Sequence, residues 1–223
     1  MNTGHAPSAQ CYMNAMRLLV LGATGGTGLH IVDQAVEHGL SVTALVRSPD
    51  ALKRFGDRIT VSRGNLLSSS ELHRVIENHD AVLSAFGTRQ PMSKEDETLL
   101  YRFVTALTGA MVQSSVRRLV IESTAFLFKD AIFPPANLIG RLFFPAIVGD
   151  GTEMENIVQK SGLDWTIVRP PRLTDRPPTG KYRVSEGHLP RFGLSISRAD
   201  VADFMLRTVQ DPTSNKRIIG ISN

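Results

Sequence analysis

Short aliphatic runs alternate with amphipathic segments along most of the chain. The runs, such as "RLLVLG" at 17–22, are apolar at nearly every position, which is typical of strands buried on both faces of a parallel sheet. The segments between them repeat apolar residues at helical spacing, as Ile31, Val32 and Ala35 do within 28–39. We therefore predict strands over 17–22, 41–47, 59–64, 80–87, 117–124, 164–171 and 216–222, and helices over 28–39, 93–114, 153–161 and 196–211.

The alternation of strands and helices predicts one α/β domain over residues 17–223, with a doubly wound parallel sheet and right-handed crossovers. Two residues mark helix ends in this pattern. Gly39 follows the first helix and is a good C-cap, and Ser197 precedes the last helix as an N-cap. No repeat and no long linker divides the chain.

Three evenly spaced glycines lie between the first strand and the first helix, in "GATGGTG" at 22–28. A glycine-rich turn in this context makes a tight turn, lets the backbone approach a pyrophosphate, and directs the helix N-terminus at it. This predicts a Rossmann-like fold that binds a dinucleotide, the alternative being a purely structural turn. The predicted pyrophosphate site comprises Gly22, Thr24, Gly25, Gly26, Thr27 and Gly28.

The end of the second strand indicates which dinucleotide is bound. Arg47 lies there, and a guanidinium matches the 2′-phosphate of NADP, whereas a carboxylate at this place would bind the ribose of NAD. The nearby Asp50 follows a proline and is expected to cap the next helix. We therefore predict NADP(H) in preference to NAD(H), unless Arg47 is an ordinary surface arginine.

The fourth strand ends in "AFGTR", which puts Phe86, Gly87 and Arg89 at the edge of the sheet where ligands bind in such folds. We expect these residues near the ribose and the phosphates. The alternative is a plain turn between strand and loop.

The motifs, taken in order, resemble a known family. The "GATGxTG" turn resembles the atypical branch of the short-chain dehydrogenases/reductases, which includes NmrA-like regulators. The segments "ESTAFLF", "DWTIVRPPRLTDRPPTGKY" and "ISRADVADFMLRTV" are similar to the NADPH-dependent flavin reductase and biliverdin-IXβ reductase family. The resemblance covers about residues 16–210.

The resemblance implies roles for several residues. Asn65 and Leu66 would meet the adenine, although most relatives have Asp at position 65. The active-site hydroxyl falls on Thr124, with Ser123 beside it, unless both bond only their own backbone. Pro170 would lie near the nicotinamide. Pro171 would lie on the substrate side, together with Arg172, a candidate catalytic residue that suits an anionic group where the animal enzyme of the family is expected to have histidine. From its place in the phenylalanine-rich segment, Phe126 is expected on the substrate side as well.

The chain lacks the Tyr-x-x-x-Lys pair with which most of the superfamily transfers protons. The residues four positions after Tyr12, Tyr101 and Tyr182 are Met, Thr and Glu. This argues against ordinary alcohol dehydrogenation but not against hydride transfer to a flavin or a bilin, which needs mainly stacking and distance. We therefore predict an NADPH-dependent reductase acting on such a planar acceptor.

Two other functions stay open. One is an NADP-sensing regulator of the NmrA type without catalysis. The other is an enzyme of isoflavone-reductase type, which would need a lysine near the site, and Lys129 is the candidate.

Five phenylalanines lie within 126–144, and residues near 126–150 and 170–195 are expected to face the substrate. The phenylalanines are expected to line a pocket for a planar acceptor, to belong to the core, or to form an interface patch.

Composition limits the remaining possibilities. The net charge is +4 without any basic block, and a single cysteine and dispersed histidines predict no disulfide and no metal site. No secretory signal and no membrane-length apolar run is present. We expect a cytoplasmic protein that is monomeric or weakly homo-oligomeric and binds a small molecule rather than nucleic acid or membranes. Residues 1–16 are expected to be a disordered tail.

Overall fold

The computed structural model describes residues 16–87, 98–128, 142 and 144–223, and the predicted tail falls almost entirely outside these ranges. Eight strands form one sheet in the order β3-β2-β1-β4-β5-β6-β10-β8. All neighbours are parallel except β10 and β8, which run antiparallel. The strands are β1 (Arg17–Leu21), β2 (Ser41–Val46), β3 (Thr60–Arg63), β4 (Ala81–Ser84), β5 (Arg118–Glu122), β6 (Asp164–Arg169), β8 (Arg183–Glu186) and β10 (Arg217–Ser222).

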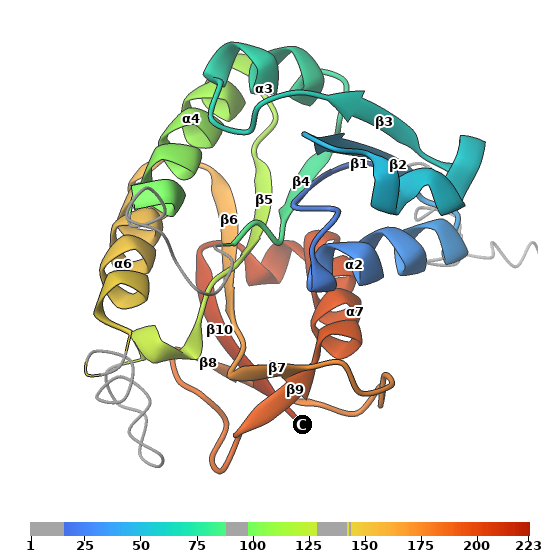
Figure 1. Cartoon of the computed structure of the whole chain (residues 1–223). Helices are drawn as coiled ribbons and strands as arrows, with labels where there is room; N and C mark the ends of the chain where they lie inside the picture. Colours follow the sequence, from blue (N-terminus) through green and yellow to red (C-terminus); the bar gives the residue numbers. More distant parts are fainter. Residues whose placement is uncertain (1–15, 88–97, 129–141, 143) are drawn as a thin grey trace, which may run out of the picture.

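The helices cover both faces of this sheet, as a doubly wound fold requires (Figure 1). One face carries α2 and α7, and the other carries α3, α4 and α6. The bounds are α2 (Gly26–Glu37), α3 (Ser69–Ile76), α4 (Leu99–Ser114), α6 (Pro145–Lys160) and α7 (Arg198–Val209), with the 3-10 helices η1 (Asp50–Arg58), η3 (Ala125–Leu127) and η4 (Pro212–Ser214). None of the helices in the described ranges is long and apolar enough to span a membrane.

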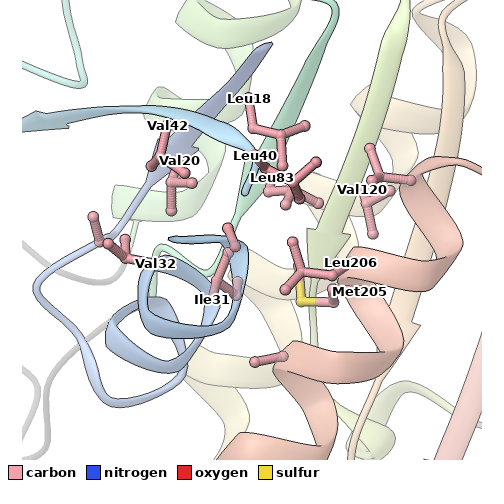
Figure 2. Close-up of a cluster of buried hydrophobic side chains, with 14 of the residues drawn as sticks. Leu18, Val20, Ile31, Val32, Leu40, Val42, Leu83, Val120, Met205 and Leu206 are labelled. Carbon is pink, nitrogen blue, oxygen red and sulfur yellow. The ribbon is translucent and has the colours of Figure 1, made fainter. Parts of the chain in front are cut away.

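The aliphatic runs are buried as their composition predicts. Every residue of β4 is buried, and so is every residue of β1 after Arg17. Between the sheet and helices α2 and α7, the side chains of Val20, Ile31, Val120 and Met205 meet in one cluster (Figure 2). A second cluster fills the space under α3, α4 and α6. This rigid base fixes where the strands end.

Two of the three predicted caps, Gly39 and Ser197, are confirmed, and the third, Asp50, is wrong. Gly39 has a φ of +73° directly after α2, and the hydroxyl of Ser197 accepts from the amide N–H of Asp200 at 2.9 Å. Asp50 does not cap the helix η1. Pro49 occupies the cap position, and Asp50 lies in the first turn and pairs with Lys53.

Several elements were not predicted because their local signals are weak. Helix α3 has only eight residues. Helix α6 begins at Pro145, whereas the sequence predicted a start at 153. The prediction began too late because glycines at 149 and 151 weaken the helical signal of the first turns. A second, two-stranded sheet pairs β7 (Arg172–Thr174) with β9 (Ser195–Ser197) (Figure 1). Strands of three residues carry no readable periodicity, and this small sheet places the segment after Pro171 beside the main sheet.

Candidate functional site

A cavity of about 1510 Å³ lies at the carboxyl ends of the parallel strands, and we call it the strand-end cavity. Ligands of open α/β sheets bind at this edge. The cavity brings together most of the residues that the sequence singled out, from strands far apart in the chain. Those that line it are Gly22, Thr24, Gly25, Gly26, Thr27, Arg47, Asn65, Leu66, Phe86, Gly87, Ser123, Thr124, Phe126, Pro170, Pro171 and Arg172. Gly28 does not line it, and Arg89 and Lys129 lie outside the described residues.

Two glycines of the turn, Gly22 and Gly28, leave no room for a side chain. Gly22 has a φ of +76°, and a Cβ there would lie 2.6 Å from the carbonyl oxygen of Ala85. A Cβ on Gly28 would lie 2.1 Å from the carbonyl oxygen of Gly22, so this glycine lets α2 pack against the end of β1. The turn thus forms a backbone cradle at the N-terminus of α2, which is the geometry that accommodates a pyrophosphate.

An exposed guanidinium lines the cavity where β2 ends. Arg47 follows β2 and makes no hydrogen bond or ion pair with another described residue. Beyond it, Asn65 is held in its own turn, because its side-chain oxygen accepts from the amide N–H of Leu67 at 3.0 Å. Leu66 is buried, and the ring of Phe86 lies 4.5 Å from that of Phe103.

The two hydroxyls after β5 have different partners. The hydroxyl of Ser123 donates to Glu155 at 2.5 Å, and Glu155 also forms a buried ion pair with Arg169. Ser123 is therefore turned toward α6 rather than toward the centre of the cavity. The hydroxyl oxygen of Thr124 accepts from the amide N–H of Phe126 at 3.3 Å, the backbone contact considered as the alternative.

Two aromatic rings line another part of the cavity. The rings of Phe126 and Phe144 stack with centroids 5.5 Å apart and planes at 15°. Arg172, at the edge of the same cavity, is exposed. Phe128 is buried under the guanidinium of Arg169, 4.5 Å from its ring centroid. The phenylalanine-rich segment therefore supplies both cavity wall and core, while its phenylalanines at 133 and 143 lie outside the described residues.

Two charged residues of the cavity were missed by sequence reasoning. Glu122, the last residue of β5, accepts from the hydroxyl of Thr27 at 3.3 Å. Burial raises the pKa of Glu122 to about 7. Arg198, at the start of α7, crosses the glycine turn, since a Cβ on Gly26 would lie 2.5 Å from the Cδ of Arg198. The available signal for Glu122 was an acid that directly follows the aliphatic residues Leu119, Val120 and Ile121.

In the parts of the chain that the structure describes, no group of His, Cys, Asp and Glu side chains is arranged to hold a metal ion. The charged side chains lining the strand-end cavity are Arg47, Asp50, Glu122, Arg172 and Arg198. Arginines outnumber acids among them, so the cavity favours an anionic ligand.

Comparisons with known proteins agree with this geometry. A family model described as NAD(P)H-binding matches residues 22–212. An uncharacterised chloroplastic protein of Arabidopsis thaliana is 30% identical over 99% of this chain and 80% of its own length. The photosystem II assembly factor Ycf39 of Synechocystis is 29% identical over 69% of this chain and 44% of its own length.

Solved structures share the fold. A short-chain dehydrogenase/reductase of Veillonella parvula in complex with NADP superposes with a TM-score of 0.77 at 18% identity, covering 93% of this chain and 94% of that one. ChuY, an anaerobillin reductase of Escherichia coli O157:H7, superposes with a TM-score of 0.76 at 20% identity, covering 92% and 96%.

Proposed function

The chain belongs to the NAD(P)H-binding family, and on this premise we propose that it is an NADPH-dependent reductase. Its acceptor is a planar, conjugated and anionic molecule, a flavin such as FMN or a bilin. One observation carries the proposal: a single cavity joins the glycine turn to the stacked rings of Phe126 and Phe144, with Arg172 at its edge. A neighbour of the same fold, ChuY, is named as a reductase of a bilin.

The residues present suit a dinucleotide. Gly22 and Gly25 place no side chain in the turn, and the N-terminus of α2 presents its first backbone N–H groups and favours negative charge. Arg47 supports NADPH over NADH, because its guanidinium lies at the end of β2 without another described partner and a 2′-phosphate supplies one. When bound, the reduced nicotinamide supplies the hydride.

The protein's own contribution to the reaction is positioning. Pro170 follows β6, and its carbonyl oxygen accepts from the amide N–H of Ala125 at 2.9 Å, so the two strand ends form one wall. We assign that wall to the nicotinamide, with the hydroxyl of Thr124 nearby. Phe126 and Phe144 provide apolar surface on which a conjugated ring stacks, and Arg172 attracts a phosphate or a propionate. The acceptor is already electrophilic, so no Tyr-Lys pair is needed.

The test is oxidation of NADPH by the purified protein with FMN, riboflavin, a bilin or a quinone as acceptor. NADH serves as the control donor. We expect turnover with NADPH on a flavin or a bilin, faster than with NADH. Tight NADPH binding without turnover on any of these acceptors would overturn the reductase proposal.

A second candidate is a dinucleotide-sensing protein that acts through a partner. It is supported by the relative Ycf39, which is named as an assembly factor, and by the missing Tyr-x-x-x-Lys pair. Such a protein would bind NADPH without turnover and retain a partner in a pull-down that NADP(H) strengthens or weakens.

A further inference from the structure

The strand-end cavity contains a carboxyl group that the proposed reaction does not use. Glu122 ends β5 between the first turn of α2 and the start of α7, and it lines the cavity beside the glycine turn. Thr27 is the one described residue that donates a hydrogen bond to its carboxylate, and Thr27 belongs to that turn. A carboxylate has room for about four hydrogen bonds, so most of its capacity is unused.

The surroundings contain little that compensates a negative charge on Glu122. From α2 it meets the Thr27 hydroxyl, and from α7 it meets the field of Arg198, which favours the ionised form. Arg198 is itself paired with Asp175 at 2.6 Å. Arg169 of the neighbouring β6 is paired with Glu155, and the remaining charged groups of the cavity are Arg47, Asp50 and Arg172. Burial therefore outweighs attraction, and the pKa of Glu122 is raised to about 7.

A dinucleotide brings two further negative charges to this place. Its pyrophosphate would lie on the glycine turn, next to Thr27 and beside the guanidinium that crosses Gly26. The pyrophosphate would repel an ionised Glu122, and it would also engage Arg198, which is the cation that favours that ionisation. Both effects stabilise the protonated carboxyl.

We infer that Glu122 is a proton-binding member of the cofactor site, so that binding of a dinucleotide takes up a proton from solution onto this carboxyl. The inference rests on the cofactor half of the proposed function and is independent of the acceptor. The neutral carboxyl retains an O–H, which the same site can donate to a ligand oxygen. Nothing is oxidised or reduced in this step, and the proton comes from the buffer.

The sign of the pH dependence follows from linkage. The complex holds more protons than the free protein, so affinity falls as pH rises through the free-protein pKa of about 7. Affinity then levels off above the still higher pKa of the complex. Below about pH 6 the carboxyl is protonated in both states and no uptake occurs.

The test compares the full chain with Glu122→Gln, which keeps the shape and an acceptor for Thr27 but cannot ionise. NADPH affinity is measured from about pH 6 to 8.5, and proton uptake is measured by calorimetry in buffers of different ionisation enthalpy. We expect similar affinities near pH 6 and roughly tenfold tighter binding by the variant near pH 8.5. Because both proteins bind the same NADPH, titration of its own 2′-phosphate cancels in the ratio. The wild type should take up a large fraction of a proton near pH 7.5 and the variant almost none.

Asp50→Asn is the matched control, since Asp50 is the other acid of the cavity. Lys53 keeps the pKa of Asp50 below its usual value, so Asp50 is ionised throughout the range and its replacement should leave proton uptake unchanged. Equal pH dependence and equal uptake in wild type and Glu122→Gln would overturn the inference. Proton-coupled NADPH binding without turnover would uphold it while overturning the reductase proposal, so the two failures are distinguishable.

Discussion

Strand β5 carries one partly buried charged side chain at each end, and the two are held very differently. At its start, the guanidinium of Arg118 uses all five of its N–H groups. They bond the carbonyls of Val209, Thr208 and Asp164 and the hydroxyls of Thr166 and Ser214. At its end, the carboxylate of Glu122 accepts one hydrogen bond from the described part of the chain, from Thr27, and it lines the strand-end cavity.

The difference distinguishes a charge whose partners all come from the protein from the one for which we propose a role in ligand binding. Burial lowers the pKa of Arg118 to about 10, so it stays protonated at neutral pH, and its bonds tie the end of α7 to the sheet. A buried charge with every partner supplied by the protein has nothing left to offer a ligand. Glu122 has capacity left over, which is typical of groups that complete their hydrogen bonds with a ligand.

The largest effect is expected for Arg118, at the start of β5. Arg118→Met should lower the free energy of unfolding by about 3 kcal/mol, because it leaves carbonyls of α7 and β6 without donors. Chemical denaturation checks this. The neighbouring Arg117→Met is the control and should cost less than about 1 kcal/mol, since its side chain is 58% exposed. If the two variants lost the same free energy of unfolding, the five hydrogen bonds of Arg118 would contribute no more to stability than the exposed side chain of Arg117.

In the strand-end cavity, loss of a charged side chain should weaken dinucleotide binding and leave the free energy of unfolding nearly unchanged. Arg47→Ala should weaken NADPH binding roughly tenfold to a hundredfold, the range for a charge-assisted hydrogen bond, and should weaken NADH binding less than about threefold. Fluorescence titration with both dinucleotides checks this.

Arg63→Ala is the control for Arg47. Arg63 is likewise exposed at the end of an adjacent strand, but it does not line the cavity. If NADPH and NADH weakened equally in Arg47→Ala, the assignment of the 2′-phosphate to Arg47 would be wrong.

A smaller effect is expected for Thr124, whose side chain lines the strand-end cavity. Thr124→Val should lower kcat for flavin or bilin reduction about tenfold with little change in NADPH affinity, as expected for loss of one hydrogen bond near the reacting atoms. Thr124→Ser should restore most of the rate. An unchanged kcat in Thr124→Val would mean that the hydroxyl has no role in the reaction and only accepts the hydrogen bond from the amide N–H of Phe126.

The sequence predicted those features whose signals are local. The aliphatic runs, the glycine turn and the Ser197 cap each depend on a few neighbouring residues, and the structure has them where expected. Arg47 was singled out by its position at the end of a strand, and the structure places it in the strand-end cavity, while its role stays a prediction. The direction of the sheet was also predicted, apart from the antiparallel β8 at its edge.

Features that depend on distant residues could not be predicted. Nothing near Glu122 in the chain reveals that Thr27 and Arg198 face it, or that burial shifts its pKa. The small sheet of β7 and β9 is likewise formed by two segments that show no pattern alone. Charged residues at the ends of aliphatic strands are therefore the positions where a structure adds most.

The smallest effect is expected at Ser123, which the sequence proposed as a catalytic partner of Thr124. Its hydroxyl instead donates to Glu155 at 2.5 Å, within the buried pair of Glu155 and Arg169. Ser123→Ala should therefore lower the free energy of unfolding by about 1 kcal/mol and change kcat less than about threefold. Denaturation and steady-state kinetics on the same preparation separate the two effects. The contrary outcome is a loss of kcat as large as that of Thr124→Val, at unchanged stability. It would show that the hydroxyl of Ser123 turns toward the strand-end cavity when ligands are bound.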